Sequence, residues 1–324
     1  MNNVTVKQHY VPQFLIKKFY NEKNKVECYN LKEGRKFLSS SENICAENNL
    51  YECVGFKENE IEKYLSQLEG EVSILLGEIL KYLDIFPLNQ GDSYIITSEK
   101  LKESNKIKEK IDFLIFFVII QILRHPFLVN QIGPIIKETI NSFDENENIK
   151  EIKEFKYFKE KLLDAGITDM STVYKMMGFK ELFDINRIVR YLYPIIQKEH
   201  KIVFFRTEKL HFICSDNSVV FDCYNIDFNN GGIKNLEINI FENSDFYFSL
   251  TPHYCLGLLK PYSWNSDVFN DEIMIRSINF RSYERITCCQ IYQSTQYIFS
   301  DVIDEKIMNI ISKCKNKNNH KVNN

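Results

Sequence analysis

The 324-residue chain has no long hydrophobic run and no strong excess of either charge. Its strongest apolar segment covers residues 113–120 and continues through Ile122 and Leu123. That segment is much shorter than the roughly 18–20 residues that cross a bilayer. We therefore predict a buried helix at this position and no association with a membrane.

Paired cysteine motifs are also missing. The nine cysteines are scattered, Cys288 and Cys289 are adjacent, and no C-x-x-C pair occurs. This pattern fits neither a disulfide framework nor a zinc site, and it favours a reducing compartment. The first residues also lack the apolar segment of a signal peptide. We expect a cytoplasmic protein.

The formal net charge is −3, with 26% charged residues. This balance excludes a global basic field, so contact with RNA or DNA would need a local basic patch. The sequence contains neither a glycine-rich phosphate loop nor a Gly-x-Ser-x-Gly elbow. The familiar P-loop and α/β-hydrolase classes are therefore not indicated.

The order of predicted elements favours an α+β fold, because helices and strands are segregated along the chain. We predict one domain over residues 1–312, followed by a disordered polar tail over 313–324. The domain would begin with a helix opened by Pro12 and a β-hairpin. A central helical block (about 58–198) and an antiparallel sheet with a late helix (about 200–300) would follow. The expected helices cover residues 59–83, 98–124, 129–141, 177–197 and 272–293. The expected strands lie at 25–31, 36–38, 202–205, 211–214, 219–221, 238–241, 246–248, 254–259 and 297–299.

Three polar segments could carry chemistry. The first is Gln8-His9, which stands just before the helix that Pro12 opens. A histidine there could act as a general acid or base, since its ordinary pKa lies near neutrality. The alternative is a structural histidine that hydrogen-bonds a nearby loop.

The second segment follows a predicted strand and contains Asp216 and Asn217. Asp216 could bind a metal, orient His9 or act as a base, and Asn217 could donate to an oxyanion. The alternative is a turn that joins two strands, because Asp, Asn and Ser form local hydrogen bonds.

The third segment ends the buried helix with Gln121, Arg124 and His125. The Arg124 guanidinium could clamp a phosphate or carboxylate with two hydrogen bonds. The alternative is an arginine paired with a core carboxylate such as Glu69 or Glu71.

Two other patterns do not carry a prediction. Arg206 and His211 have the spacing of a motif found in helical ribonucleases, but here they span two predicted strands instead of one helix. Asp216, Asp222 and Asp227 lack the trailing lysine expected of a two-metal nuclease.

Taken together, these segments resemble the domain of unknown function 4238, a mostly bacterial family. The resemblance is carried in order by Gln8-His9-Tyr10-Val11-Pro12-Gln13-Phe14-Leu15 with Phe19, Ala46-Glu47, Leu50-Tyr51, Gln121, Arg124, Pro126, Ser215-Asp216-Asn217, Ser249-Leu250-Thr251-Pro252 and Asn279. This chain has Ser218 where the family usually has proline. The resemblance implies one domain in which His9, Arg124 and Asp216 share a role, and it supplies no established activity.

We therefore predict a nuclease-like phosphodiester hydrolase that acts on RNA or DNA as a bacterial toxin or phage-defence effector. His9, Arg124 and Asp216 would be catalytic, while Gln8, Glu47, Gln121 and Asn217 would bind substrate. A divalent metal is an open expectation. The alternatives are a non-enzymatic module that binds a nucleotide or a partner, and a structural partner in an operon-encoded complex that uses the aromatic segment 155–158.

Overall fold

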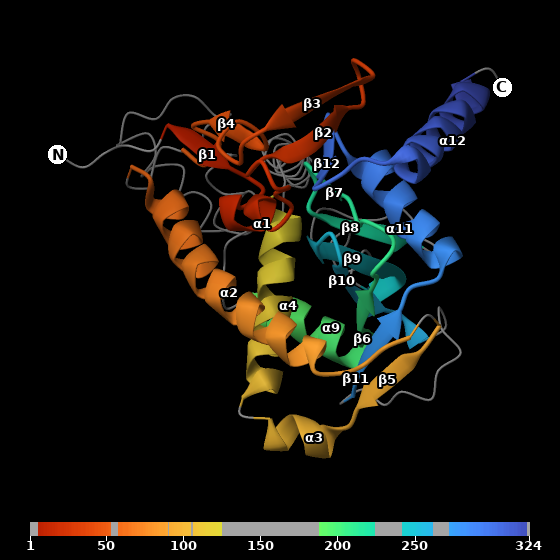
Figure 1. Ribbon diagram of the computed structural model, residues 1–324. Coiled ribbons are helices and arrows are strands. Elements are labelled where there is room, and N and C mark those ends of the chain that lie inside the picture. Colours follow the sequence, from red (N-terminus) through yellow and green to blue (C-terminus); the bar gives the residue numbers. More distant parts are fainter. Residues whose placement is uncertain are drawn as a thin grey trace, which may run out of the picture.

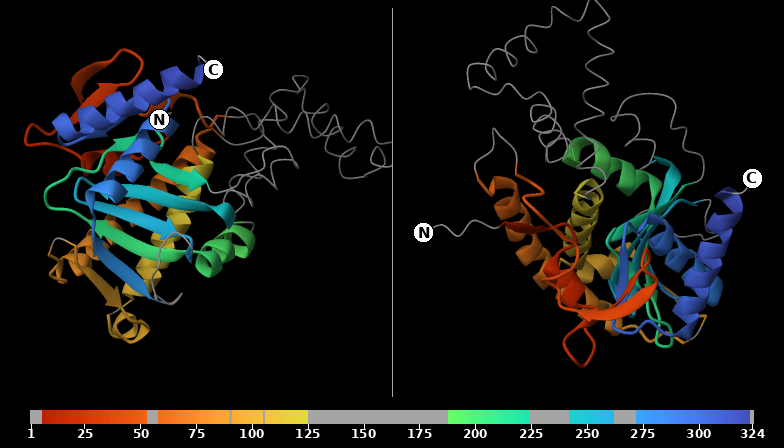
Figure 2. Two further views of the ribbon diagram at one scale, coloured as in Figure 1. Left: turned by 90° about the vertical axis from the view of Figure 1, so that its right-hand side faces the viewer. Right: turned by 90° about the horizontal axis from the view of Figure 1, so that it is seen from above.

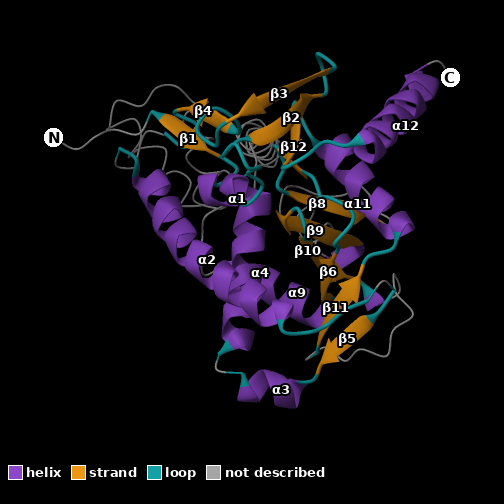
Figure 3. Cartoon of the chain, in the orientation of Figure 1, coloured by secondary structure: helices purple, strands orange, loops and turns teal. Residues whose placement is uncertain are grey.

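The computed structural model describes residues 6–52, 58–89, 91–104, 106–124, 188–223, 242–261 and 272–322 (Figure 1). Helices and strands are segregated as expected for an α+β fold, which Figure 3 shows by colour. The predicted helix 129–141, strand 238–241 and aromatic segment 155–158 lie outside the described residues. So do His125, Pro126, Asp227 and the first part of the predicted helix 177–197.

The largest sheet is six-stranded and mixed. Its order is β5-β11-β6-β10-β9-β8, and β11 runs parallel to β6 while the other pairs are antiparallel. The sheet was predicted to be antiparallel, and only the β11–β6 pair of this sheet differs from that prediction. The strands are β5 (Ser93–Ile96), β6 (Lys201–Arg206), β8 (Val219–Cys223), β9 (Ser244–Thr251), β10 (Tyr254–Leu259) and β11 (Ile273–Ser277).

Both faces of this sheet are covered at its centre, so β6 and β10 bury consecutive apolar residues. Along β6, Ile202 and Phe204 belong to one core cluster, whereas Val203 and Phe205 belong to a second. Helices α2 (Glu60–Asp84) and α4 (Ile107–Leu123) supply the first cluster, and α11 (Phe280–Gln293) and α12 (Glu305–Val322) supply the second. Figure 2 shows the resulting helix–sheet–helix layers.

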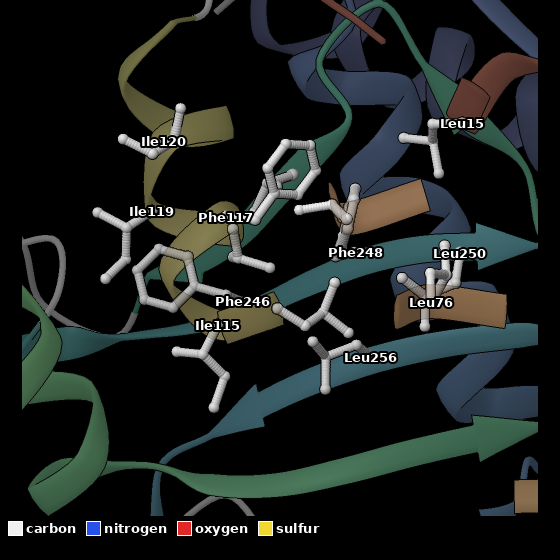
Figure 4. Close-up of a cluster of buried hydrophobic side chains, with 14 of the residues drawn as sticks. Leu15, Leu76, Ile115, Phe117, Ile119, Ile120, Phe246, Phe248, Leu250 and Leu256 are labelled. Carbon is white, nitrogen blue, oxygen red and sulfur yellow. The ribbon is translucent and has the colours of Figure 1, made fainter. Parts of the chain in front are cut away.

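Helix α4 is the centre of the first cluster, as its apolar sequence predicted. Ile115, Phe117 and Ile119 lie in one cluster with Phe246 and Phe248 of β9 (Figure 4), and the ring centroids of Phe117 and Phe248 are 6.3 Å apart. The predicted helix 98–124 is in fact broken into α3 (Ser98–Glu103) and α4, with Lys106 in a left-handed conformation at φ 67° between them. Beyond the break, α4 buries Ile107, Ile111 and most of the residues from Leu114 to Leu123.

A smaller four-stranded sheet joins the two ends of the chain. Its order is β3-β2-β12-β7, so the N-terminal hairpin pairs with a strand near the C-terminus. The strands are β2 (Val26–Asn30), β3 (Arg35–Ser39), β7 (Cys214–Ser215) and β12 (Tyr297–Ser300). The predicted strand 211–214 is mostly loop, and only its end enters β7.

The start of the described chain forms a third, two-stranded sheet. Strand β1 (Lys7–His9) pairs with β4 (Ala46–Asn48), which sets Gln8 opposite Glu47. Helix α1 (Gln13–Lys17) begins directly after Pro12, as predicted, and buries Leu15 completely.

Two further boundaries differ from expectation. The predicted helix 272–293 begins as strand β11 and becomes helical only at Phe280, because residues 273–277 pair on both sides within the sheet. Helix α12 continues to Val322 through residues where a disordered polar tail was expected. The residues of the predicted helix 177–197 that are described form a π-helical turn (Ile188–Leu192) and then α9 (Tyr193–Glu199).

Candidate functional site

Arg124 lies at the end of α4 and is 1% exposed. Its Nε donates to the Tyr51 hydroxyl at 3.1 Å, its Nη1 donates to Glu69 Oε1 at 2.6 Å, and its Nη2 donates to the backbone carbonyl of His9. Burial alone would lower the pKa of Arg124, but Tyr51 and Glu69 raise it overall. The guanidinium is therefore charged and engaged with protein groups. Arg124 therefore pairs with a carboxylate at the edge of the core, which was the alternative to a phosphate clamp, and the partner is Glu69.

Gln8 and His9 are also turned inward. Gln8 is fully buried; its Oε1 accepts from the Tyr51 amide at 2.6 Å and its Nε2 donates to Glu52 at 2.7 Å. The His9 ring lies 3.1 Å from the Ser41 carbonyl through Nε2 and 3.5 Å from the Gln13 amide nitrogen through Nδ1. Burial lowers the pKa of His9. A neutral ring that donates from Nε2 and accepts at Nδ1 satisfies both contacts.

Asp216 has no exposed surface, and its carboxylate accepts four hydrogen bonds. They come from the backbone amides of Thr295, Gln296 and Tyr297 and from the Thr295 hydroxyl, at 2.6–3.1 Å. The carboxylate therefore fixes the loop between α11 and β12. It does not orient His9, since the His9 ring nitrogens face Ser41 and Gln13.

The predicted segments meet at α4 through side chains that hold the fold together. Arg124 binds the backbone after β1, while Gln121, one turn earlier, accepts from the Ser218 hydroxyl at 3.4 Å. The amide of Asn217 donates to Ser215 Oγ at 3.2 Å, which is the local turn considered above. The exposed Glu47 lies on β4. The catalytic and substrate-binding roles of these residues stay predictions.

Glu62 on α2 was not singled out from the sequence. It faces Arg124, Glu69 and Glu52 electrostatically, and burial raises its pKa to about 7. Its Oε2 is buried and has no hydrogen-bond partner among the described residues. Only the helical spacing from Ile61 and Leu65 could have suggested that it lies at the edge of the core. It is a carboxyl group that changes charge near neutral pH.

We expect Glu62→Gln to remove a pH-dependent loss of stability. An ordinary glutamate ionises near pH 4.5 in the unfolded chain, whereas Glu62 ionises near 7 in the folded protein. Ionisation therefore costs folding free energy progressively from pH 4.5 to 7, by about 1–3 kcal/mol. The stability of Glu62→Gln relative to the natural protein should rise over that range in chemical denaturation. The exposed Glu71→Gln on the same helix is the control, and equal pH profiles for both variants would contradict the prediction.

A second cluster of polar groups lies in the loop that follows β6. The Nδ1 atom of His211 is 3.0 and 3.1 Å from the two carboxylate oxygens of Asp301. Asp301 is held in turn by the Ser300 hydroxyl at 3.0 Å and the Val302 amide at 2.9 Å. The hydrogen bond to Asp301 raises the pKa of His211. Burial would raise the pKa of Asp301, but its contacts with His211, Ser300 and Val302 together lower it. The pair is a histidine oriented by a carboxylate.

His253 brings a second imidazole to this cluster. It lies exposed in the turn between β9 and β10, and its ring centroid is 5.5 Å from that of His211. Thr251 shapes the turn, because its hydroxyl accepts from the amides of His253 and Tyr254 at 3.1 and 3.0 Å. The Pro252 carbonyl accepts from the Phe212 amide at 2.8 Å, which ties the turn to the His211 loop.

The cluster opens on a surface cleft of about 620 Å³ lined by His253, Asp301, Arg206 and others. Arg206, at the end of β6, donates from Nη1 to the Phe86 carbonyl at 3.1 Å and keeps 21% of its side chain exposed. The carboxylates of the lining have protein partners. Asp84 accepts from Tyr254 at 2.6 Å, and Glu208 lies 3.8 Å from Arg206.

This cleft could have been found only in part from the sequence. Arg206 and His211 lie at a strand end and in a loop, so rejecting the helical ribonuclease motif was justified. Arg206 nevertheless lines the cleft, and His211 is joined to it through its hydrogen bond to the lining residue Asp301. Thr251-Pro252 was named as a motif, and it shapes and lines the cleft. Asp301 carried no recognisable pattern, because its partner His211 lies 90 positions earlier.

Among the described residues, no group of three or more His, Cys, Asp or Glu side chains is arranged to hold a metal ion. The described residues therefore provide no set of ligands for the divalent metal that was left as an open expectation. Over the same residues, no helix is both long and apolar enough to cross a membrane.

The class of the protein follows from comparison with known families. The model of the family described as "Protein of unknown function (DUF4238)" matches residues 7–302. The chain belongs to this family, as the motifs around His9, Arg124 and Asp216 suggested. No curated protein and no solved structure matches the chain.

Proposed function

We propose that this protein hydrolyses a phosphodiester in the cleft beside His211, Asp301 and His253. The observation that carries the proposal is the geometry of the two imidazoles: one is bonded to a carboxylate, and the other lies 5.5 Å away at an exposed turn. General acid–base hydrolysis needs one group that takes a proton from the nucleophile and a second group that gives a proton to the leaving oxygen. Neighbouring histidines meet that need near neutral pH.

Each group has a distinct role in this reaction. Asp301 orients His211 through Nδ1 and raises its pKa, which favours the protonated ring. His253 accepts a proton from the attacking water as the water oxygen forms the new bond to phosphorus. His211 gives its proton to the leaving oxygen as the old phosphorus–oxygen bond breaks. Within the described residues, no protein group hydrogen-bonds Nε2 of His211 or either ring nitrogen of His253, so these atoms are available.

Arg206 is the group best placed to hold the phosphate. It is partly exposed in the cleft and anchored by the Phe86 carbonyl, so its direction is fixed. Planar guanidinium groups donate paired hydrogen bonds to phosphate oxygens. Arg124 is a weaker candidate for this role, because its three donor positions already serve Tyr51, Glu69 and His9.

Incubating the purified protein with single-stranded RNA and DNA tests the proposal. We expect cleavage, and we expect His211→Asn to lower kcat by roughly 10²-fold or more, the usual contribution of a general acid. His9→Asn is the matched control, since it alters the histidine predicted from the sequence. Loss of activity only in His9→Asn would overturn the cleft assignment. Nucleotide binding without cleavage would instead indicate the non-enzymatic module.

The pH profile separates catalysis from structure. As a general acid, His211 must be protonated, so activity should fall as pH rises through its raised pKa. Asp301→Asn removes the partner that raises this pKa, and the alkaline limb should move to lower pH. A merely structural Asp301 would leave the limb in place. Adding EDTA to the same assay tests the divalent-metal expectation.

The biological use as a toxin or phage-defence effector is a further part of this proposal. It is supported by the proposed catalytic pair of His211 and His253. Expression of the natural protein and of His211→Asn in a bacterial host, with and without phage infection, tests it. A growth or protection phenotype that survives the substitution would contradict an enzymatic effector.

A further inference from the structure

A second pocket, of about 260 Å³, adjoins the cleft and shares the wall formed by Arg206, Thr207 and Glu208. This wall is a turn held by hydrogen bonds. The Thr207 hydroxyl accepts from the Leu210 amide at 2.9 Å, and the Thr207 amide donates to the His253 carbonyl at 3.0 Å. The pocket is therefore fixed in position relative to the histidine pair.

The lining of this pocket combines three kinds of side chain. Apolar surface comes from Leu88, Leu210, Ile278 and Phe280, an amide comes from Asn89, and cationic groups come from Arg206, Lys209 and Lys306. Glu208 is the one carboxylate among the described residues that line it. Positive charge thus predominates beside an apolar wall, which suits an anion joined to a flat apolar group.

Phe280 is the most unusual member of the lining, because this large aromatic side chain is 49% exposed. It is the first residue of α11, and Asn279 caps that helix by accepting from the Ser282 amide at 2.9 Å. The cap fixes the start of α11 and therefore the position of Phe280. The Phe280 ring also packs against Tyr283, with 6.2 Å between the ring centroids. A fixed, exposed ring is a surface on which a base can stack.

We propose that this pocket is a nucleotide subsite: the base stacks on Phe280, the Asn89 amide meets the base edge, and Lys209 and Lys306 hold the phosphate. This inference rests on the proposed function and assigns its substrate class, a nucleic acid chain bound across Arg206. The base would occupy the smaller pocket while the adjoining phosphodiester lies beside the two histidines. Such a subsite would select nucleotide diesters over other phosphodiesters.

Equilibrium binding tests the subsite without requiring turnover. AMP, UMP, ribose 5-phosphate and inorganic phosphate are titrated into the full chain by calorimetry. We expect AMP to bind roughly 5- to 100-fold more tightly than ribose 5-phosphate, the usual effect of one aromatic stacking contact. Phe280→Ala should abolish this difference, and Phe280→Trp should keep it. Lys209→Ala and Lys306→Ala should weaken all the phosphate-bearing probes alike.

The control is Tyr292→Ala, which removes another exposed aromatic from the same helix. It should leave every affinity unchanged. Equal binding of AMP and ribose 5-phosphate to the natural protein, or an unchanged preference in Phe280→Ala, would overturn the subsite. Base-dependent binding without hydrolysis would keep the subsite and reject the proposed reaction, so the two failures are distinguishable.

Discussion

Replacing Asp216 with alanine is expected to lower the free energy of unfolding by about 3–5 kcal/mol, since it removes a fully buried carboxylate that accepts hydrogen bonds from four donors. Three of them are the backbone amides of residues 295–297, and the fourth is the Thr295 hydroxyl. Loss of this acceptor should loosen β12, which holds the N-terminal hairpin to the rest of the protein. Chemical denaturation measures the change.

Asp222→Ala is the matched control for this experiment. Asp222 is also a carboxylate in this part of the chain, but it is 30% exposed and pairs with Arg285 at 2.5 Å. An exposed pair contributes only about 0–1 kcal/mol. If Asp216→Ala kept its stability and lost only enzymatic activity, the structural role would be wrong and the catalytic prediction for Asp216 would stand.

Arg124→Met should be almost as damaging, at about 3–5 kcal/mol, because it leaves Glu69 and the buried His9 carbonyl without their cationic partner. Methionine retains much of the apolar stem, so the change reports mainly on the charge and hydrogen bonds. Adding Glu69→Gln to Arg124→Met should cost less than the sum of the two single changes, since the unpaired carboxylate is gone.

Arg35→Met provides the comparison, because Arg35 is an exposed arginine whose side chain is 72% accessible beside Glu33. We expect it to change stability by less than about 1 kcal/mol. Normal stability of Arg124→Met, together with loss of binding to phosphate-bearing substrates, would restore Arg124 as the phosphate clamp predicted from the sequence.

These expectations separate two parts of the molecule. Around Arg124 the polar groups are buried and hydrogen-bonded to one another, and they join β1, α2 and the end of α4. Around His211 the polar groups are partly exposed and border a cleft. Buried, satisfied networks serve the fold, whereas exposed titratable groups beside a cleft can meet a substrate. The family motifs contribute to both parts, since Thr251 and Pro252 shape the cleft.

The sequence by itself determined the local elements wherever the pattern was strong. The apolar spacing predicted α2 to within a residue at each end, and Pro12 correctly marked the start of α1. The same patterns predicted the hairpin of β2 and β3 and the strands β6 and β10. Each depends on short-range periodicity, which a linear sequence records directly. The chain's motifs also placed it in its family.

Only the tertiary structure decided which polar side chains face one another. The sequence around Asp216 fits a local turn as well as a buried carboxylate that binds residues 295–297. It does not distinguish the two, because those partners lie about 80 positions further along the chain. The pairing of His211 with Asp301 likewise depends on β12 returning beside β7. The parallel pairing of β11 with β6 turned an expected helix start into a strand. Long-range contacts overrode local preference at each of these points, and the candidate site is built from them.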